Sequence, residues 1–147
     1  MTDIASITLW HRRARPDPTD KDFQVQFGCH LEEIAEMLIC LEGDDQVTKN
    51  KLATMAFQLA GAAEGFKRGV YSADIVNRKE FLDACCDQVV TAVGAAYCAQ
   101  MDIEQGMAIV NTSNWSKFDD QGQPLRDENG KIKKGPRYNP PHLDECV

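Results

Sequence analysis

The sequence predicts an all-α fold of four to five helices followed by an irregular C-terminal segment. Three observations support this class. Long segments place apolar residues three and four positions apart, and helix-capping residues precede several of these segments. No segment alternates apolar and polar residues over the length of a β-strand. Four of the six prolines and three glycines lie in residues 116–147, where no helical period continues. A chain of 147 residues fits one domain. We therefore expect a helical bundle over residues 1–115 and an irregular basic segment of the same domain over residues 116–147.

The first two helices are predicted from their boundaries. Residues 3–14 form a short helix that ends before Pro16, because proline disfavours the helical conformation in the residue before it. The second helix begins at a cap, Thr19 or Asp20, and continues to the residues just before Gly43. Its apolar residues alternate in spacing between four and three, which predicts a core-facing stripe of Phe27, Leu31, Ile34, Leu38 and Leu41.

Three more helices are expected further along the chain. The third covers residues 46–68 and repeats apolar residues at helical spacing, which again predicts a core-facing side. Asn77 caps a fourth helix that reaches about Gln100, and Asp102 opens a fifth that ends near Asn114. The apolar residues of the third helix are Leu52, Met55, Leu59, Ala62 and Phe66.

Composition and charge exclude several classes of partner. The net charge is −7, with 23 acidic and 16 basic residues, which disfavours general nucleic-acid binding because such binding needs clustered Lys and Arg. No apolar run reaches the length of a membrane span, and the start of the chain lacks a signal-peptide pattern. The six cysteines contain no C-x-x-C pair, so we expect buried thiols rather than disulfides or zinc ligands. These features predict a cytoplasmic protein with no membrane partner.

Two pairs of acidic residues lie on separate predicted helices. Glu33 and Glu36 are three residues apart on the second helix, and Glu80 and Asp83 are three residues apart on the fourth. Residues at this spacing share a helix face, so each pair aims two carboxylates in one direction. Like charges this close need a counter-charge, and four carboxylates from two facing helices suit Mg²⁺ or Mn²⁺. The pairs therefore predict a divalent-metal site.

An ordinary solvated helix face is the alternative interpretation of these acids. On the second helix the acids do lie opposite the apolar stripe, but Val25, Cys29 and Ile39 share their face. On the fourth helix, residues 88–101 contain no charged residue, which predicts a helix buried on every side with its acids at one end. Unpaired charge there is costly, and a bound metal removes that cost. The Glu-x-x-His pairs of ferritin-like iron proteins are absent from the sequence, which favours magnesium or manganese over iron.

The acidic pairs belong to a longer motif. Glu-Glu-x-x-Glu on one helix and Glu-x-x-Asp on a later one resemble the acidic signature of the MazG-like all-α nucleoside triphosphate pyrophosphohydrolases, a superfamily that includes the dimeric dUTPases. Residues 113–118 (SNWSKF), 130–138 (GKIKKGPRY) and 140–143 (PPHL) look like the C-terminal loop of phage-encoded members. The resemblance covers most of the chain beyond the first helix. The 43 residues between the two acidic motifs are more than is usual in the family, which indicates an inserted helix. The matching acids are Glu32, Glu33, Glu36, Glu80 and Asp83.

The resemblance implies a catalytic helical bundle that hydrolyses a nucleoside or deoxynucleoside triphosphate to the monophosphate and pyrophosphate. Either Glu32 or Glu33 would orient or deprotonate the attacking water. Bound metal would neutralise phosphate oxygens and lower the pKa of that water. The implied ligands of Mg²⁺ or Mn²⁺ are Glu33, Glu36, Glu80 and Asp83.

Basic and polar residues near the C-terminus are candidates for contact with the substrate. Residues 131–137 hold a basic cluster with no acid in an otherwise acidic protein, and ammonium and phenol groups can donate to phosphate oxygens. A disordered solubilising tail is the alternative. The phosphate-binding candidates are Asn114, Lys117, Lys131, Lys134 and Tyr138. The base-binding candidates are Trp10, His11 and Asn111, with Trp115 as a further aromatic residue.

The preferred substrate and the assembly are also expectations. A phage branch of the family, called MazZ, is implied to act on dGTP, so dGTP or GTP is the predicted substrate. A dUTPase and a broad dNTP-clearing enzyme are the alternatives. A non-catalytic helical module that senses a nucleotide or binds a partner protein is the alternative from another class. Helices that are apolar on two sides predict a homo-oligomer, and the relatives are dimers or dimers of dimers.

Overall fold

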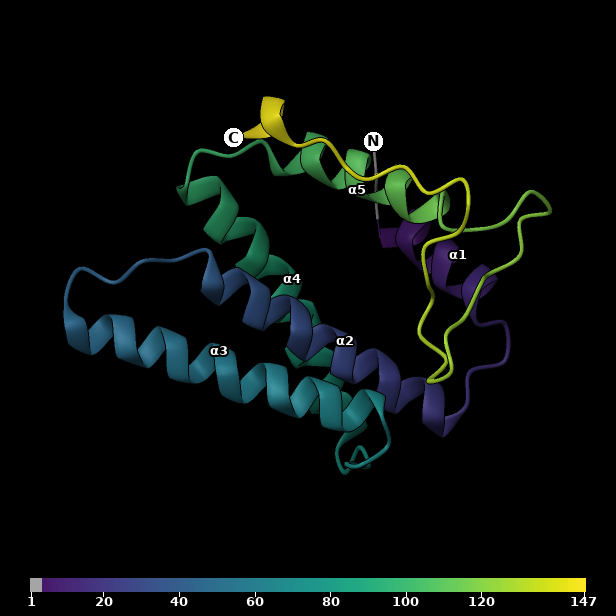
Figure 1. Ribbon diagram of the computed structural model, residues 1–147, viewed down its shortest axis with the longest axis horizontal. Coiled ribbons are helices and arrows are strands. Elements are labelled where there is room, and N and C mark those ends of the chain that lie inside the picture. Colours follow the sequence, from purple (N-terminus) through teal and green to yellow (C-terminus); the bar gives the residue numbers. More distant parts are fainter. Residues whose placement is uncertain (1–3) are drawn as a thin grey trace. The chain divides into compact units, whose positions relative to one another are not determined.

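The computed structural model describes residues 4–147, and within them the protein is all-α, as predicted (Figure 1). It has five α-helices, one short 3₁₀-helix and no β-strand among these residues. Asp3, which was expected in the first helix, lies outside the described residues. None of the helices in residues 4–147 has the length and apolarity needed to span a bilayer. The elements are α1 (Ile4–Ala14), α2 (Asp20–Ile39), α3 (Gln46–Lys67), α4 (Arg78–Cys98), α5 (Ile103–Trp115) and η1 (Asp144–Cys146).

Side-chain caps fix where four of these helices begin. The Thr19 hydroxyl accepts a hydrogen bond from the Asp22 backbone N–H, and the Asp22 carboxylate accepts one from the Thr19 backbone N–H. This capping box satisfies two donors that a helix start leaves without partners. Asp45, Asn77 and Asp102 each accept from the backbone N–H three residues ahead and cap α3, α4 and α5. The predicted caps of α2, α4 and α5 are therefore confirmed.

The chain forms two compact units, which we describe separately. Unit 1 contains the described residues up to Pro16, together with Asp74–Leu125 and Ile132–Val147. Unit 2 contains Asp17–Ala73 and Arg126–Lys131. Helices α1, α4 and α5 therefore belong to unit 1, and α2 and α3 belong to unit 2. The C-terminal segment contributes to both units, because residues 126–131 fold with unit 2 and their flanking residues fold with unit 1.

Unit 2 is a helical hairpin in which α2 and α3 pack side by side along their lengths (Figure 1). Small residues form the buried seam: Gly28 and Ala35 on α2, and Ala56 and Ala63 on α3. The backbones approach closely, since a Cβ atom at Gly28 would lie 2.7 Å from the Ala63 carbonyl oxygen. Any side chain at that position would meet the facing helix.

The predicted stripes of large residues occupy the flanks of this seam. Phe27, Leu31 and Ile34 are half-buried, whereas Leu41 lies beyond the end of α2 and is 55% exposed. Met55 on α3 is also exposed. The prediction that these last two residues face the core is wrong. Leu41 is exposed because α2 ends before it, at Ile39. Met55 is exposed because small residues such as Ala56 and Ala63 occupy the buried side of α3.

Unit 1 has an aromatic core that ties the first helix to the C-terminal segment. Trp10, Ala14, Phe118 and Ile132 are buried together, and Trp115 packs against them. The rings of Trp10 and Phe118 stack with their centroids 5.7 Å apart, and the Trp10 indole N–H donates to the Asn114 carbonyl at 2.9 Å. Phe118 and Ile132 therefore anchor parts of the segment that was predicted to be irregular.

Helix α4 is the largest departure from expectation. It was predicted to be buried on every side, but it has no buried residue, and Leu82, Val90 and Tyr97 are 65%, 68% and 78% exposed. Within unit 1, α4 contacts only α5 among the helices. A helix that is apolar all round needs a partner on each side, and its own unit supplies one. The prediction of burial is therefore wrong for α4 within unit 1.

The cysteines differ in part from prediction. None of the six, all of which lie in residues 4–147, forms a disulfide. Only Cys146 is buried, and Cys29 is partly buried. The other four are exposed, so the prediction of burial is wrong for them. Three of the four lie on α4 and share its exposure, namely Cys85, Cys86 and Cys98.

Candidate functional site

The α2 acidic pair lies on the exposed side of unit 2. Glu33 and Glu36 are one helical turn apart, and both are exposed, whereas Ala35 between them is buried in the seam with α3. The capping box fixes the start of α2, and the close packing at Gly28 fixes its contact with α3. Both carboxylates are thus held on a braced helix and remain accessible to a ligand.

The α4 acidic pair lies in the first two turns of its helix in unit 1. Asn77 caps α4 by accepting from the Glu80 backbone N–H at 3.2 Å, which fixes the turn that carries the Glu80 carboxylate. Asp83 follows one turn later, and both side chains are exposed. Asp87 continues the acidic face by one further turn. This pair therefore matches the α2 pair in spacing and accessibility.

Each unit by itself offers two of the four predicted metal ligands. Glu33 and Glu36 belong to unit 2, and Glu80 and Asp83 belong to unit 1. Across residues 4–147, no group of three or more His, Cys, Asp or Glu side chains lies together in a way that could hold a metal ion. The predicted four-carboxylate site therefore takes one pair of ligands from each unit.

Glu32 has a different environment from its two neighbours in the motif. Its Oε1 accepts a hydrogen bond from Lys67 Nζ at 2.7 Å, and its Oε2 accepts one from Lys131 Nζ at 2.7 Å. The Glu32 side chain is 27% exposed and that of Lys67 is 11% exposed. Lys67 Nζ also lies 3.4 Å from a carboxylate oxygen of Glu64. Glu32 is therefore the centre of a partly buried charge network within unit 2.

This network shifts the pKa of all three groups. Burial acts to raise the pKa of Glu32, but hydrogen bonds from Lys131 and Lys67 outweigh burial and hold the pKa below its ordinary value. Burial acts to lower the pKa of each lysine, but the hydrogen bond and charge of Glu32, together with Glu64 at Lys67 and Cys29 at Lys131, outweigh burial, so both pKa values are raised. A carboxylate with a lowered pKa and both oxygens occupied is a weak general base.

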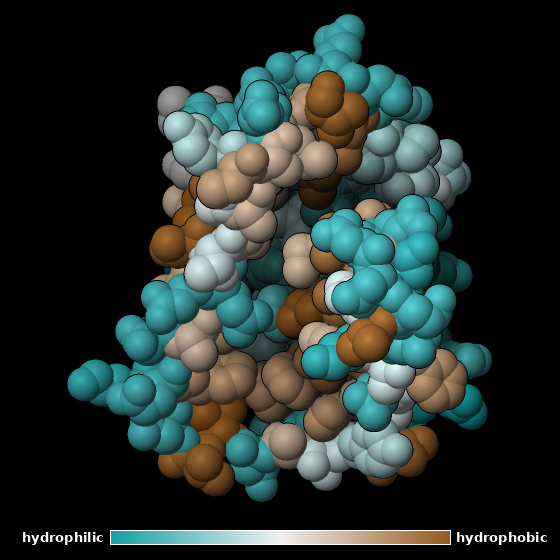
Figure 2. Space-filling model, turned by 90° about the vertical axis from the view of Figure 1, so that its left-hand side faces the viewer, coloured by the Kyte–Doolittle hydropathy of each residue, from teal (hydrophilic) through white to brown (hydrophobic). Residues whose placement is uncertain are grey.

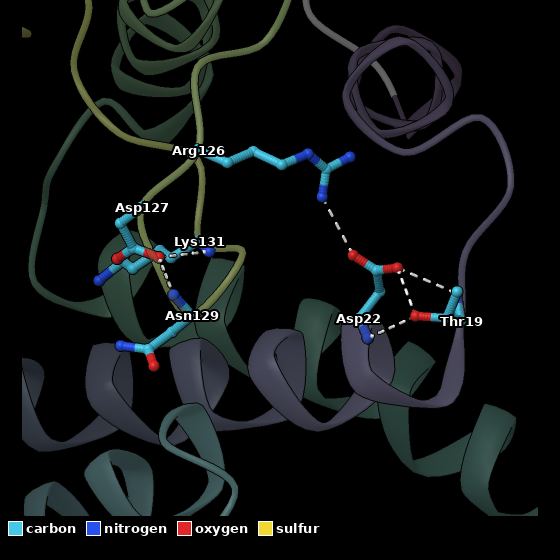
Figure 3. Close-up of polar contacts among 6 residues, drawn as sticks. All are labelled: Thr19, Asp22, Arg126, Asp127, Asn129 and Lys131. Atoms are coloured by element: carbon cyan, nitrogen blue, oxygen red, sulfur yellow. Dashed lines mark hydrogen bonds and ion pairs between the residues drawn. The ribbon is translucent and has the colours of Figure 1, made fainter.

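Lys131, whose ammonium group bonds Glu32, lies in a tight turn. Figure 3 shows the polar contacts that shape this turn and attach it to the start of α2. Asp127 Oδ1 accepts from the backbone N–H groups of Asn129 and Lys131, each at 2.9 Å. At the start of the turn, Arg126 Nη1 donates to Asp22 Oδ1 at 3.1 Å, while the other oxygen of Asp22 bonds Thr19. The turn is thus attached to α2 near its N-terminus and, through Lys131, at Glu32 in the helix interior.

The other predicted phosphate-binding residues gather in unit 1, after α5. Lys117 Nζ donates to Asn114 Oδ1 at 2.7 Å, and Lys134 Nζ lies 4.7 Å from the centre of the Tyr138 ring. The backbones that carry these two pairs approach each other at Gly135, because a Cβ atom there would lie 2.9 Å from the Lys117 carbonyl oxygen. Two ammonium groups, an amide and a phenol therefore come from neighbouring backbone segments, as a phosphate site would require.

The predicted base-binding residues are used in packing. Trp10 is buried in the core of unit 1, and His11 packs edge-on against it with the ring centroids 4.9 Å apart. Burial, with a contribution from Arg15, lowers the pKa of His11, so its imidazole is neutral at pH 7. Asn111 donates to the Ser6 hydroxyl at 2.8 Å. Trp115 is only partly buried and is the aromatic residue better placed to contact a ligand.

Two residues around Glu32 were not predicted from the sequence. Lys67 bonds Glu32 directly, and Arg126 attaches the turn that carries Lys131 to α2. Lys67 lies in the last turn of α3, where a basic residue is ordinary, and it meets Glu32 35 positions away. Arg126 lies outside the basic cluster that the sequence emphasised, and it meets Asp22 104 positions away. Neither contact has a periodic signal, since each depends on where another segment folds.

The chain was compared with protein-family models, with curated proteins and with solved structures. No protein-family model, curated protein or solved structure matches the chain.

Proposed function

We propose that the protein is a metal-dependent nucleoside triphosphate pyrophosphohydrolase. The observation that carries this proposal is the presence of two exposed carboxylate pairs at one-turn spacing, one on α2 and one near the start of α4. The motif to which they belong resembles that of the MazG-like family. Its five acids are Glu32, Glu33, Glu36, Glu80 and Asp83.

The donor set fits a hard divalent cation. All four proposed ligands are carboxylates, and oxygen ligands are those that Mg²⁺ and Mn²⁺ prefer. Their exposure leaves room for a triphosphate, which would supply further oxygens. When bound, the metal would neutralise phosphate charge and make a coordinated water more acidic. Glu33, Glu36, Glu80 and Asp83 are the residues proposed to hold it.

The remaining residues have roles of their own in this proposal. Glu33 orients the attacking water and accepts its proton, because its carboxylate is exposed. Glu32 holds Lys67 and Lys131 in place rather than acting as the base. Lys117 and Lys134 bind phosphate oxygens, with Asn114 and Tyr138 as hydrogen-bond donors. The proposed products are a nucleoside monophosphate and pyrophosphate.

Product analysis tests this function directly. The purified protein is incubated with each dNTP and with GTP, in the presence of Mg²⁺ or Mn²⁺, and the products are resolved by chromatography. We expect monophosphate and pyrophosphate, with dGTP or GTP turned over fastest and no turnover in excess EDTA. Fastest hydrolysis of dUTP, or equal hydrolysis of all dNTPs, would replace the guanine preference with one of the other substrate assignments. No monophosphate from any nucleotide, with the helical circular dichroism intact, would contradict the enzyme and favour a non-catalytic helical module.

We also propose a homo-oligomer, either a dimer or a dimer of dimers. Exposed apolar side chains support this, because α4 exposes seven apolar residues between Val89 and Cys98. Figure 2 shows apolar residues at the surface of one face of the molecule. Light scattering on the eluate of a sizing column gives the mass in solution. A single species with the 16.4 kDa mass of one chain would contradict the proposal.

A further inference from the structure

Unit 1 contains a pocket that includes none of the residues proposed to bind metal or phosphate, although Trp115, a base-binding candidate, is part of its lining. Its volume is about 420 Å³, which lies in the range of small-molecule sites. Helix α1, the end of α5 and the C-terminal segment all contribute to it. The residues that line it are Leu9, Arg13, Trp115, Phe118, Gly122 and Arg137.

The apolar part of the pocket is partly aromatic. Phe118 is only 2% exposed, and its ring meets that of Trp115 edge to face with the centroids 5.4 Å apart. Trp10 stacks on Phe118 and completes the support. Leu9 is 57% exposed, although it is a large apolar residue on a helix that packs into the core. These groups offer a supported apolar surface for a flat ring.

Two arginines supply positive charge at the same pocket. Arg13 Nε donates to the Gly122 carbonyl at 3.0 Å, and Arg137 donates to the carbonyls of Phe118 and Asp119. Both guanidinium groups are therefore held by the backbone of one loop. Gly122 has a φ of 70° and permits this approach, since a Cβ atom there would lie 3.3 Å from Arg13 Nη2.

The charge of Arg13 is not neutralised within the part of the chain that the structure describes. No carboxylate in residues 4–147 forms an ion pair with Arg13, and a guanidinium has five N–H donors, of which the Gly122 bond uses one. Arg137 does pair with Asp120 at 2.9 Å, but the Asp120 side chain is 81% exposed, so water weakens that pair. A planar anion would find bidentate donors here.

We propose that this pocket binds an aromatic anion, meaning a flat ring that carries a phosphate or carboxylate group. The ring contacts Trp115 and Leu9, and the anionic group contacts Arg13 and Arg137. A nucleoside monophosphate and an aromatic carboxylate share this chemistry. The inference does not rest on the proposed hydrolase activity, because the pocket uses none of the acidic motif residues.

Calorimetric titration in EDTA tests the pocket in the absence of metal and turnover. The probes are guanosine 5′-monophosphate and indole-3-acetate, and the controls are guanosine and inorganic phosphate, which each carry half of the proposed chemistry. We expect at least one aromatic anion to bind and both controls to bind much more weakly. Binding of guanosine 5′-monophosphate alone identifies the phosphate source, and binding of indole-3-acetate alone identifies the carboxylate source. No binding of either aromatic anion at millimolar concentration overturns the inference, as does equal binding of inorganic phosphate.

Matched variants locate the binding. Arg13→Gln should weaken it by about tenfold or more, because a hydrogen bond to a charged group is lost. Arg12→Gln is the control, since Arg12 is the exposed neighbour on α1 and does not line the pocket. Leu9→Asp is a second variant at an exposed position and should abolish binding by placing a carboxylate beside the anion. Equal affinities of the Arg12 and Arg13 variants, or full binding by Leu9→Asp, would place the ligand elsewhere and refute the assignment.

Discussion

Glu36→Gln and Asp83→Asn should each abolish nucleotide hydrolysis while leaving the fold intact. Each amide keeps the size of the side chain but removes the negative charge that a hard cation requires. Losing a residue that only orients a metal ligand costs about 10 to 100-fold, so losing a ligand itself should lower kcat/KM by at least about 100-fold. Both side chains are exposed, so their replacement leaves no buried group without a partner. The measurement is product formation per minute at saturating Mg²⁺ or Mn²⁺.

The control for these variants is Glu104→Gln. Glu104 is an exposed glutamate in the first turn of α5 and lies outside the acidic motif, so its replacement should leave activity unchanged. Circular dichroism of every variant verifies the helices. Activity near that of the wild type in either motif variant, with all proteins folded, would show that the carboxylates on α2 and α4 are assigned the wrong role.

Glu32→Gln should destabilise unit 2 rather than act on the metal. The change removes the charge that pairs with Lys67 and Lys131, and Lys67 is only 11% exposed, so its ammonium would be left partly buried without its closest partner. Hydrogen bonds to charged groups are worth about 1.5–3 kcal/mol each, and the greater exposure of Lys131 reduces its share, so we expect a loss of about 2 kcal/mol in the free energy of unfolding. Urea unfolding followed by circular dichroism measures this loss.

Two comparisons make this stability prediction specific. Glu36→Gln, on the same helix but exposed, should change the free energy of unfolding by less than about 0.5 kcal/mol. Both tryptophans lie in unit 1, so tryptophan fluorescence follows that unit, and the effect of Glu32→Gln should be larger in circular dichroism than in fluorescence. Equal stability of the Glu32 and Glu36 variants would contradict the role given to the network.

The pH dependence of the same network follows from the directions of its pKa shifts. The pKa of Glu32 is lowered in the folded protein, so its contribution is present above the unfolded value, near pH 4, and is lost as the pH falls through the folded value. The pKa values of Lys67 and Lys131 are raised, so their contribution is lost as the pH rises above about 10.4 through the folded values. Between these limits the contribution of the network is constant, and Glu32→Gln should remove the acid-side loss that it causes.

The helices could be predicted closely because their signals are local. Thr19, Asn77 and Asp102 act within three residues of themselves, so each cap can be recognised from the residues around it. Burial could be predicted less well. The α2 and α3 stripes were recognised, but the seam between them consists of small residues such as Gly28 and Ala63, whose importance depends on the facing helix. Helix α4 looks buried from its composition, although its own unit covers it only at α5.

The candidate site also has features that the sequence predicts and features that it does not. Helical spacing was enough to pair Glu33 with Glu36 and Glu80 with Asp83, and the structure keeps each pair exposed on one helix. The environment of Glu32 could not be predicted, because its partners lie 35 and 99 positions away. The pocket with Arg13 and Arg137 was also absent from the prediction, since it combines residues from both ends of unit 1.

Local signals were enough to predict the all-α class, the helix boundaries and the two acidic pairs, since propensity, capping and one-turn spacing depend on neighbours a few residues apart. The folded chain was needed to see which residue of the acidic motif is neutralised by lysines, which aromatic residues are used in packing, and where an arginine lacks a carboxylate partner. Those properties depend on the burial and charge that distant segments bring to a side chain. Glu32 and Glu33 are adjacent in the sequence, yet one is held by two ammonium groups and the other is exposed on the surface of α2.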